Sequence, residues 1–370
     1  MRTQDRWQPL REAVGAYERV KHPGRALFGF DGYIDSLYAV VERTDDRGNP
    51  SVFQTSDAFL RCLMQLQGQS AERELLLKSR RAGGNAPLSA MAAGALGVDA
   101  HCVGYVGQEE FARIGCRMTS LGAPAECIAL EFANCKWMLS CCESLHAFTA
   151  RGLERQLGRE ALCRLLEQVE LIALLNWAAM PENAGVVQML LEDYWERAAL
   201  GSKTFFVDFS DISSQAERTI ARTMDVLGRL SRRAHVVVSV NLHEAQSIAQ
   251  AGTSAGEETL LRRIHERTGA QEIVLHAMDH ALCLEDGVLA GCRGAYHPAP
   301  VITTGGGDHF NGGYCAARLA NLPAPQRLAL ATCTALYYVA HGTSGSAARI
   351  RAWLDSPQLH CLEESSCRPI

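Results

Sequence analysis

Three consecutive glycines, Gly305, Gly306 and Gly307, stand directly before Asp308 in the stretch TTGGGDHFNGG. Glycine has no Cβ, so the backbone of such a run can approach a ligand closely. If a helix begins here, its first N–H groups are unpaired and carry a partial positive charge, which suits an anion such as phosphate. The run therefore predicts a backbone cradle for anionic oxygen with a carboxylate beside it. The alternative is a loose turn before a helix-stabilising acid.

Two other nucleotide-binding motifs are absent from the chain. No GxxxxGK[ST] segment is present, which excludes a P-loop, and no GxGxxG follows a predicted strand, which weakens the case for a dinucleotide-binding fold. A phosphate-binding interpretation therefore depends on the glycine run.

The elements that must position the glycine run alternate between short apolar segments and longer amphipathic ones. The predicted strands are 25–30, 171–176, 204–209, 235–240 and 272–277. The predicted helices are 182–199, 215–232, 243–251, 257–268, 308–320 and 325–340. This alternation favours parallel strands with helices on both faces of the sheet, and such sheets bind ligands beyond the carboxyl ends of their strands. Segments 33–60 and 101–150 interrupt the alternation and are interpreted as a small β element attached to the sheet.

The motifs resemble those of the ribokinase-like (PfkB) sugar and nucleoside kinases. ITTGGGDHFNGG (302–313) is similar to the family's DTTGAGDxFxGG, and GGNAPLSAMAAGALG (83–97) is similar to its GGxxxNxAxxxxxLG. Three more segments resemble family motifs in the family's order: FGFDGYIDSLY (28–38), VGYVGQEEFA (103–112) and NLHE (241–244). The resemblance implies an α/β fold of three α/β/α layers with a mostly parallel central sheet. It also implies a single domain, 1–370, with a small β lid formed by segments 33–60 and 101–150.

The resemblance also implies roles for the matching residues on the reaction side. Asp308 corresponds to the catalytic base, and the amides of Gly305, Gly306 and Gly307 correspond to the anion hole. An aspartate with the ordinary pKa of about 3.9 is a weak base, which a late proton transfer would tolerate. The expected substrate-side residues are Asp35, which would bind sugar hydroxyls, the additional acid Asp31, and Gly83, Gly84 and Asn85.

On the nucleotide side, Glu244 of NLHE corresponds to the acid that helps to hold Mg²⁺, largely through water. The other expected nucleotide-side residues are Thr304, Asn241, His276, His341 and Gly342, and Asp208 is a further candidate at a strand end. Two positions depart from the family pattern. Ile302 replaces an acid near a monovalent-cation site, so potassium activation is not implied, and Leu88 replaces a substrate-side asparagine.

Composition agrees with an enzyme of this kind. Of the 370 residues, 47% are hydrophobic and 21% charged, and the net charge of −5 gives no basic footprint for nucleic acid. The N-terminus lacks the apolar core of a signal peptide, and no apolar run reaches the roughly 18–20 residues that span a bilayer. We therefore expect a soluble cytoplasmic protein without a membrane partner. The 14 cysteines show no CxxC spacing and are interpreted as free thiols.

These observations predict an ATP- and Mg²⁺-dependent phosphotransferase acting on a hydroxyl, expected to be a hydroxymethyl, of a small sugar or polyol. Two alternatives stay open: a nucleoside kinase of the same fold, and a ligand-binding or regulatory homologue without turnover. The acceptor and the oligomeric state are not determined by the sequence, and a homodimer is one option.

Overall fold

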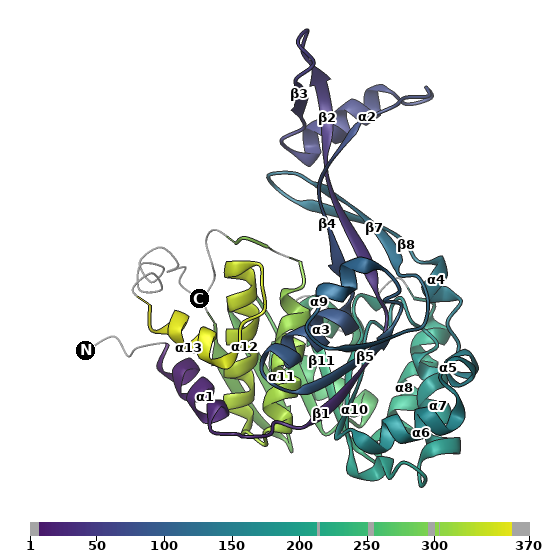
Figure 1. The fold of residues 1–370 in the computed structure, drawn as a ribbon, viewed down its shortest axis with the longest axis vertical. Helices are drawn as coiled ribbons and strands as arrows, with labels where there is room; N and C mark the ends of the chain where they lie inside the picture. Colours follow the sequence, from purple (N-terminus) through teal and green to yellow (C-terminus); the bar gives the residue numbers. More distant parts are fainter. Residues whose placement is uncertain (1–6, 213–214, 251–254, 295–299, 303, 357–370) are drawn as a thin grey trace.

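A nine-stranded sheet forms the centre of the computed structural model, which describes residues 7–212, 215–250, 255–294, 300–302 and 304–356 (Figure 1). In sheet order its strands are β14 (Val288–Arg293), β13 (His280–Glu285), β12 (Glu272–His276), β11 (His235–Asn241), β10 (Thr204–Asp208), β9 (Leu171–Leu174), β1 (Arg25–Phe30), β5 (Asp99–Gly104) and β6 (Arg117–Ser120). The strands from β12 to β6 are parallel, and β13 and β14 add antiparallel at one edge. The five predicted strands are confirmed.

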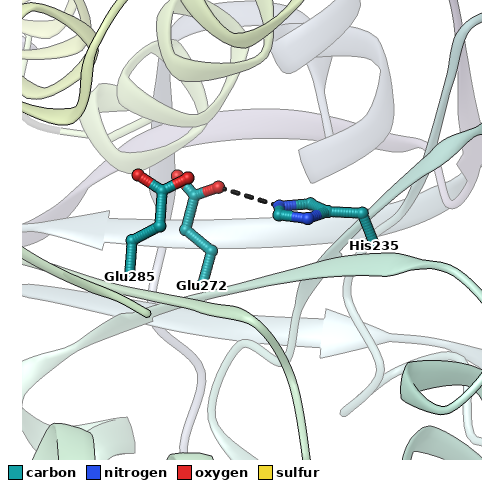
Figure 2. A group of neighbouring side chains, drawn as sticks. All are labelled: His235, Glu272 and Glu285. Atoms are coloured by element: carbon teal, nitrogen blue, oxygen red, sulfur yellow. Dashed lines mark hydrogen bonds and ion pairs between the residues drawn. The ribbon is translucent and has the colours of Figure 1, made fainter. Parts of the chain in front are cut away.

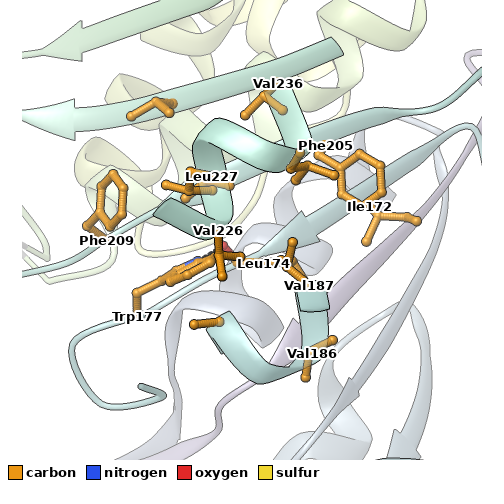
Figure 3. Close-up of a cluster of buried hydrophobic side chains, with 14 of the residues drawn as sticks. Ile172, Leu174, Trp177, Val186, Val187, Phe205, Phe209, Val226, Leu227 and Val236 are labelled. Carbon is orange, nitrogen blue, oxygen red and sulfur yellow. Dashed lines mark hydrogen bonds between the residues drawn. The ribbon is translucent and has the colours of Figure 1, made fainter. Parts of the chain in front are cut away.

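Helices cover both faces of this sheet, because successive strand residues point to opposite sides and both sides are apolar. In β10, Phe205 and Val207 pack into one hydrophobic cluster and Phe206 into the other. The first cluster includes side chains of α6 (Arg159–Gln168), α7 (Asn183–Met189), α8 (Glu217–Ser231), α9 (Leu242–Ile248) and α10 (Glu257–Thr268). Figure 3 shows the part of it where α7 and α8 pack on the sheet. The second includes side chains of α1 (Gln8–Glu18), α3 (Asn85–Ala95), α11 (Gly306–Leu319), α12 (Ala324–His341) and α13 (Ala347–Leu354). The predicted three layers are confirmed.

The remaining helical segments are short. They are α4 (Glu143–His146), α5 (Ala150–Leu157), and the 3₁₀ turns η1 (Glu109–Arg113) and η3 (Leu200–Ser202). The predicted helix over 182–199 is α-helical only in α7 and continues as a π-helical segment, η2 (Leu190–Tyr194).

A second sheet of five strands projects from the main body (Figure 1). It contains β3 (Pro50–Val52), β2 (Tyr33–Thr44), β7 (Ala125–Glu131) and β8 (Lys136–Cys141) in that order, with β4 (Leu75–Gly83) also paired to β2. Helix α2 (Ser56–Gln65) packs Phe59 against Trp137 of β8. The small sheet thus differs from the predicted segments 33–60 and 101–150. It includes β4, and β5 and β6 belong to the large sheet because β5 pairs with β1 on one side and β6 on the other.

Polar residues gather where the parallel strands of the large sheet end. Asp31 and Asn176 closely follow β1 and β9, Asp208 and Asn241 end β10 and β11, and His276 ends β12. The carboxyl ends of parallel strands lie at one edge of the sheet, so these side chains face a common region, as ligand-binding α/β sheets predict.

Helices α3 and α11 pack so closely that Gly312 of α11 has no room for a side chain. A Cβ at Gly312 would overlap the carbonyl oxygen of Ser89 and lie 2.7 Å from Ala92 Cβ. We therefore expect Gly312→Ala to lower the free energy of unfolding by about 1–3 kcal/mol, the usual cost of overpacking. Urea unfolding followed by circular dichroism measures this change.

The matched control is Gly228→Ala in the middle of α8, where the nearest atom to an added Cβ is Arg232 Nη1 at 3.8 Å. Alanine is the better helix former, so this control should be stabilised by about 0.5–1 kcal/mol. Equal stability of the two variants would contradict the packing argument.

Candidate active site

Asp31 is fully buried and holds the start of α3 in place. Its Oδ1 accepts a hydrogen bond from the Ala86 amide (2.8 Å), and its Oδ2 accepts from the Asn85 amide (2.9 Å) and from Asn176 Nδ2 (2.8 Å). Burial raises the pKa of Asp31, and these hydrogen bonds oppose the rise. The substrate contact predicted for Asp31 stays a prediction, and in the structure its carboxylate holds the first turn of α3 and Asn176.

Gly83 and Gly84 leave space for the two acids. Gly84 caps α3 with φ at 101°, a conformation that glycine adopts at little cost, and a Cβ there would lie 3.3 Å from Asp31 Oδ2. A Cβ on Gly83 would lie 2.6 Å from Asp35 Oδ2. The Asp35 carboxylate therefore rests directly against the Gly83 backbone, as expected for residues of one substrate site.

Asp35 lies on β2 of the small sheet and is only partly buried. Burial raises the pKa of its carboxyl, whereas the positive charges of Arg81 and Lys136 lower it. A carboxylate that is open on one side and flanked by cations is a strong acceptor for the hydroxyls of a sugar.

The predicted anion hole lies at the start of α11. Gly305 caps the helix with φ at 88°, and a Cβ there would lie 3.0 Å from Leu88 Cδ1 and 3.2 Å from Tyr338 Oη. Because helix residues at this end have no earlier turn to bond to, the N–H groups of Gly306, Gly307 and Asp308 are available to a ligand. Gly306 and Gly307 both line the cavity described below.

Asp308 stands in the first turn of α11 and is partly exposed to solvent. Burial raises its pKa well above the ordinary value, and the negative charges of Asp208, Asp31, Asp35 and Glu244 add to the rise. A carboxyl with a raised pKa binds a proton more tightly once ionised. Asp308 is therefore a better base than the ordinary aspartate assumed from sequence.

Asp208 organises a buried polar cluster beside Asp308. Its Oδ1 accepts from Asn85 Nδ2 (3.2 Å), and its Oδ2 accepts from Asn311 Nδ2 (2.6 Å). Ser239 Oγ in turn donates to Asn311 Oδ1 (2.7 Å). Burial raises the pKa of Asp208 to about 6. Asn85, predicted as a substrate ligand, thus directs its amide nitrogen to Asp208. Asn311 was not predicted, although it follows Asp308 by three positions on the same helix.

Asn241 and Glu244 form a reciprocal cap at the start of α9. Asn241 Oδ1 accepts from the Glu244 amide (2.9 Å), and the Glu244 carboxylate accepts from both the amide (3.0 Å) and Nδ2 (2.6 Å) of Asn241. Burial, followed by the charge of Asp208, raises the pKa of Glu244 to about 8. Carboxylates that raise one another's pKa are stabilised by a nearby cation. Hard oxygen donors of this kind fit Mg²⁺ held mainly through water.

In the described part of the chain, one group of His, Cys, Asp and Glu side chains converges closely enough to ligate a metal directly: His235, Glu272 and Glu285 (Figure 2). Arginines already neutralise this group, since Arg327 Nη2 lies 2.9 Å from Glu272 Oε1 and Arg318 Nη2 lies 3.0 Å from His235 Nε2. His235 and Glu272 also begin their strands, at the end of the sheet opposite Asp308. We interpret the group as a structural ion-pair network.

A cavity of about 820 Å³ opens beside the glycine run, and two predicted nucleotide-side residues, Asn241 and His276, line it. Its wall also includes Gly306, Gly307 and Phe310. His276 Nε2 is buried without a hydrogen-bond partner, and burial lowers the pKa of His276 to about 4. A neutral imidazole with an unused nitrogen is suited to a hydrogen bond with a bound ligand.

Three other predicted nucleotide-side residues lie elsewhere within the described ranges. Thr304 accepts a hydrogen bond from Arg81 instead of lining the cavity. The His341 ring stacks on Tyr337, with 4.1 Å between ring centroids, and Gly342 ends α12 in a left-handed conformation. Neither His341 nor Gly342 lines the cavity, so a direct nucleotide contact is less supported for them than for His276.

The structure adds three residues that were not predicted. Tyr338 places its hydroxyl beside Gly305, and Arg81 reaches Thr304. His309 bonds through Nδ1 to the Gly305 carbonyl (2.8 Å) and through Nε2 to Ser344 Oγ (2.8 Å), which fixes the cap of α11. A histidine next to the motif aspartate gave no signal of this role, because its partners are distant in sequence or main-chain atoms.

No helix within the described ranges has the length and apolar character needed to cross a lipid bilayer.

Known proteins resemble this chain in sequence and in fold. The profile of the prokaryotic ketohexokinase family matches residues 4–356. A ketohexokinase of Haloferax volcanii is 27% identical over 343 residues, which cover 89% of this chain and 90% of that protein. An Arabidopsis thaliana ribokinase complexed with ribose and ATP has a similar fold, with a TM-score of 0.64, 11% identity, and coverage of 90% of this chain and 99% of that one. A putative ribokinase II from E. coli in complex with ATP and Mg²⁺ also has a similar fold, with a TM-score of 0.63, 11% identity, and coverage of 90% of this chain and 99% of that one. These likenesses confirm the ribokinase-like fold.

The crowded carboxyls should make stability fall as pH rises. The pKa of Glu244 is about 8 in the folded protein against an ordinary 4.5, so between these values the folded state binds more protons than the unfolded state. By linkage, the free energy of unfolding then decreases with pH, by at most about 1.4 kcal/mol per pH unit for one group. We expect urea unfolding without metal to show this decrease between about pH 5 and 8.

Glu244→Gln should make stability depend less on pH, because it removes one titrating group. The control is Glu258→Gln in α10, where the exposed Glu258 pairs with Arg262, and this variant should keep the wild-type pH dependence. Added Mg²⁺ should also flatten it. An identical slope in wild type and Glu244→Gln would refute the assignment.

Proposed function

The chain belongs to the prokaryotic ketohexokinase family, and from this membership we propose that its acceptor is a ketohexose, phosphorylated on a hydroxymethyl group. The chain is an ATP-dependent sugar kinase, as predicted. Sugar and ATP are therefore its substrates. A ketohexose carries a hydroxymethyl at each end of its carbon chain, which fits the acceptor group expected from sequence.

One observation carries the assignment of the reacting residues. Asp308 directly follows Gly306 and Gly307, which line the cavity, and the charge of the small-sheet acid Asp35 raises the pKa of Asp308. We assign the cavity to the nucleotide and the surroundings of Asp35 and Gly83 to the sugar. A terminal phosphate at the helix start would then meet a hydroxyl held by Asp35.

The transfer follows from these positions. Asp308 accepts the proton of the hydroxymethyl oxygen, which forms a bond to the γ-phosphorus. The bond from that phosphorus to the β–γ bridging oxygen breaks, and ADP leaves. The amides of Gly306 and Gly307 donate to the phosphoryl oxygens, where one such donor contributes about 3–4 kcal/mol. Mg²⁺, near Glu244 through water, would supply charge neutralisation on the nucleotide phosphates.

Asp308→Asn should reduce ADP release on the order of 10²–10⁴-fold, the usual contribution of a general base, while leaving ATP binding intact. ADP release is measured with ATP and Mg²⁺ and a panel of ketohexoses, aldohexoses, pentoses, polyols and nucleosides, with ³¹P NMR of the product. Asp225→Asn on the exposed face of α8 is the matched control and should retain full activity.

Preference for a nucleoside would replace the proposed acceptor. No turnover with any acceptor would support the binding or regulatory alternative. Normal turnover in Asp308→Asn would reject the base assignment.

We also propose that the enzyme works in the cytoplasm, where ATP is available, and that it associates into homodimers through the small sheet. Ile128 and Leu139 are directly paired on neighbouring strands of this sheet and are 36% and 51% exposed. Apolar neighbours exposed together on a projecting element are typical of an association surface.

Leu139→Glu should convert the dimer to a monomer, because it places a charge on this surface. Sedimentation velocity measures this change as a lower sedimentation coefficient. Val288→Glu, at the far edge of the large sheet where Val288 is 70% exposed, should leave the sedimentation coefficient unchanged. A monomeric wild type would contradict the dimer.

A further inference from the structure

Strand β4 carries two adjacent arginines that point to opposite faces of the small sheet, since strand residues alternate in direction. Arg80 forms exposed ion pairs with Glu110 (2.8 Å) and Glu126 (3.3 Å). Arg81 lies directly across from Asp35 in the β2–β4 pairing, two residues before Gly83. Arg80 is thus neutralised outside the site, and Arg81 faces into it.

Arg81 connects the small sheet with the loop before the anion hole. Its Nη2 donates to Thr304 Oγ1, the residue next to Gly305, across 223 positions of sequence. Among the described residues, no carboxylate oxygen lies within 4.0 Å of its guanidinium, so Arg81 has no ion-pair partner of the kind that Arg80 has. A guanidinium has five N–H donors, so most of them stay available to a ligand.

The charges around Arg81 are those of the transfer site. Burial raises the pKa values of Asp35 and Tyr338, and the positive charge of Arg81 lowers both by a smaller amount. The negative charges of Asp308 and Asp35 raise the pKa of Tyr338. Arg81, Asp35, Asp308 and Tyr338 are therefore within electrostatic reach of one another. Tyr338 Oη also adjoins Gly305, which brings this group to the anion hole.

We propose that Arg81 is a catalytic residue whose guanidinium, anchored on Thr304, binds oxygens of the phosphoryl group as it passes from ATP to the sugar. The assignment rests on the proposed function of the site. A planar guanidinium matches the geometry of phosphate oxygens, and its charge offsets part of the charge carried by the phosphoryl group and the surrounding carboxylates. It supplies no covalent step; the proton still passes to Asp308 and the leaving group is still ADP.

This placement also ties catalysis to the small sheet that carries the sugar ligand Asp35. The two residues are cross-strand partners, so an arrangement that seats Asp35 over the acceptor also brings Arg81 to Thr304. Arg81 then reaches the phosphoryl group only when Asp35 holds a sugar in place. Transfer of the phosphoryl group to water is thereby limited.

The test compares Arg81→Met with Arg80→Met, a change of the same kind on the same strand. With the best acceptor of the panel, Arg81→Met should lower kcat on the order of 10²–10³-fold, as expected for loss of one transition-state donor. KM for ATP should change far less. Arg80→Met should keep kcat within about twofold, because its partners are exposed. Arg81→Lys should retain part of the activity.

Two further measurements separate a catalytic role from a structural one. Guanidinium chloride at millimolar, non-denaturing concentration should raise the turnover of Arg81→Ala toward that of wild type and should leave the near-normal turnover of Arg80→Ala unchanged. Thr304→Val removes the anchor but keeps the cation, so it should lose much less activity than Arg81→Met.

Equal losses in Thr304→Val and Arg81→Met, with no rescue by guanidinium, would overturn the proposal and leave Arg81 as a support for the loop. Unchanged kcat in Arg81→Met would overturn it as well. Failure of the proposed function is distinct, since wild type would then show no preference for a ketohexose in the same assay.

Discussion

Mutual repulsion among five buried or half-buried carboxylates is the constraint around which this site is built. Asp31, Asp35, Asp208 and Glu244 all raise the pKa of Asp308. Such a group is unstable unless each member is held by donors or offset by cations. The fold supplies different solutions: main-chain amides for Asp31, asparagines for Asp208, the reciprocal cap for Glu244 and arginine for Asp35.

Those solutions explain why the acids differ in role although they are close together. Asp31 has three donors and no exposure, so it organises α3 and the glycines in front of Asp35. Asp308 lies in the first turn of a helix and is partly exposed, so in the proposed function its raised pKa strengthens it as a base. The negative charge of these carboxylates favours the binding of a divalent cation or a guanidinium. It disfavours the binding of a phosphate group that has no cation beside it. Phosphoryl transfer here therefore requires positive charge from outside the acidic cluster.

Much of the fold could be predicted from the sequence, because five central strands are short apolar runs and their helices have clear amphipathic patterns. Within the site, Asp308, Gly306, Gly307 and Asp35 could be proposed from sequence because their motifs depend on local spacing. The burial of Asp31 and its three donors could not be predicted, because one sequence does not reveal which side chains surround an acid. Arg81 was missed because β4 was not predicted. Without that strand, the sequence SRRAGG does not show which of its two arginines points into the site. The contact of Arg81 with Thr304 also joins segments 223 positions apart, which a local pattern cannot reveal.

The two sheets are joined where this chemistry occurs. Strand β1 ends at Phe30 and β2 begins at Tyr33, so Asp31 and Gly32 form one of the short connections between the buried sheet and the projecting one. Asp31 is fixed by α3, which itself packs on α11, the helix that presents Asp308. Asp308 and the start of the small sheet are thereby held to one layer of helices, while Asp35 and Arg81 lie on strands β2 and β4 beyond it. Because Asp35 and Arg81 are paired across β2 and β4, a displacement of these strands would move Asp35 and the Arg81 contact with Thr304 together.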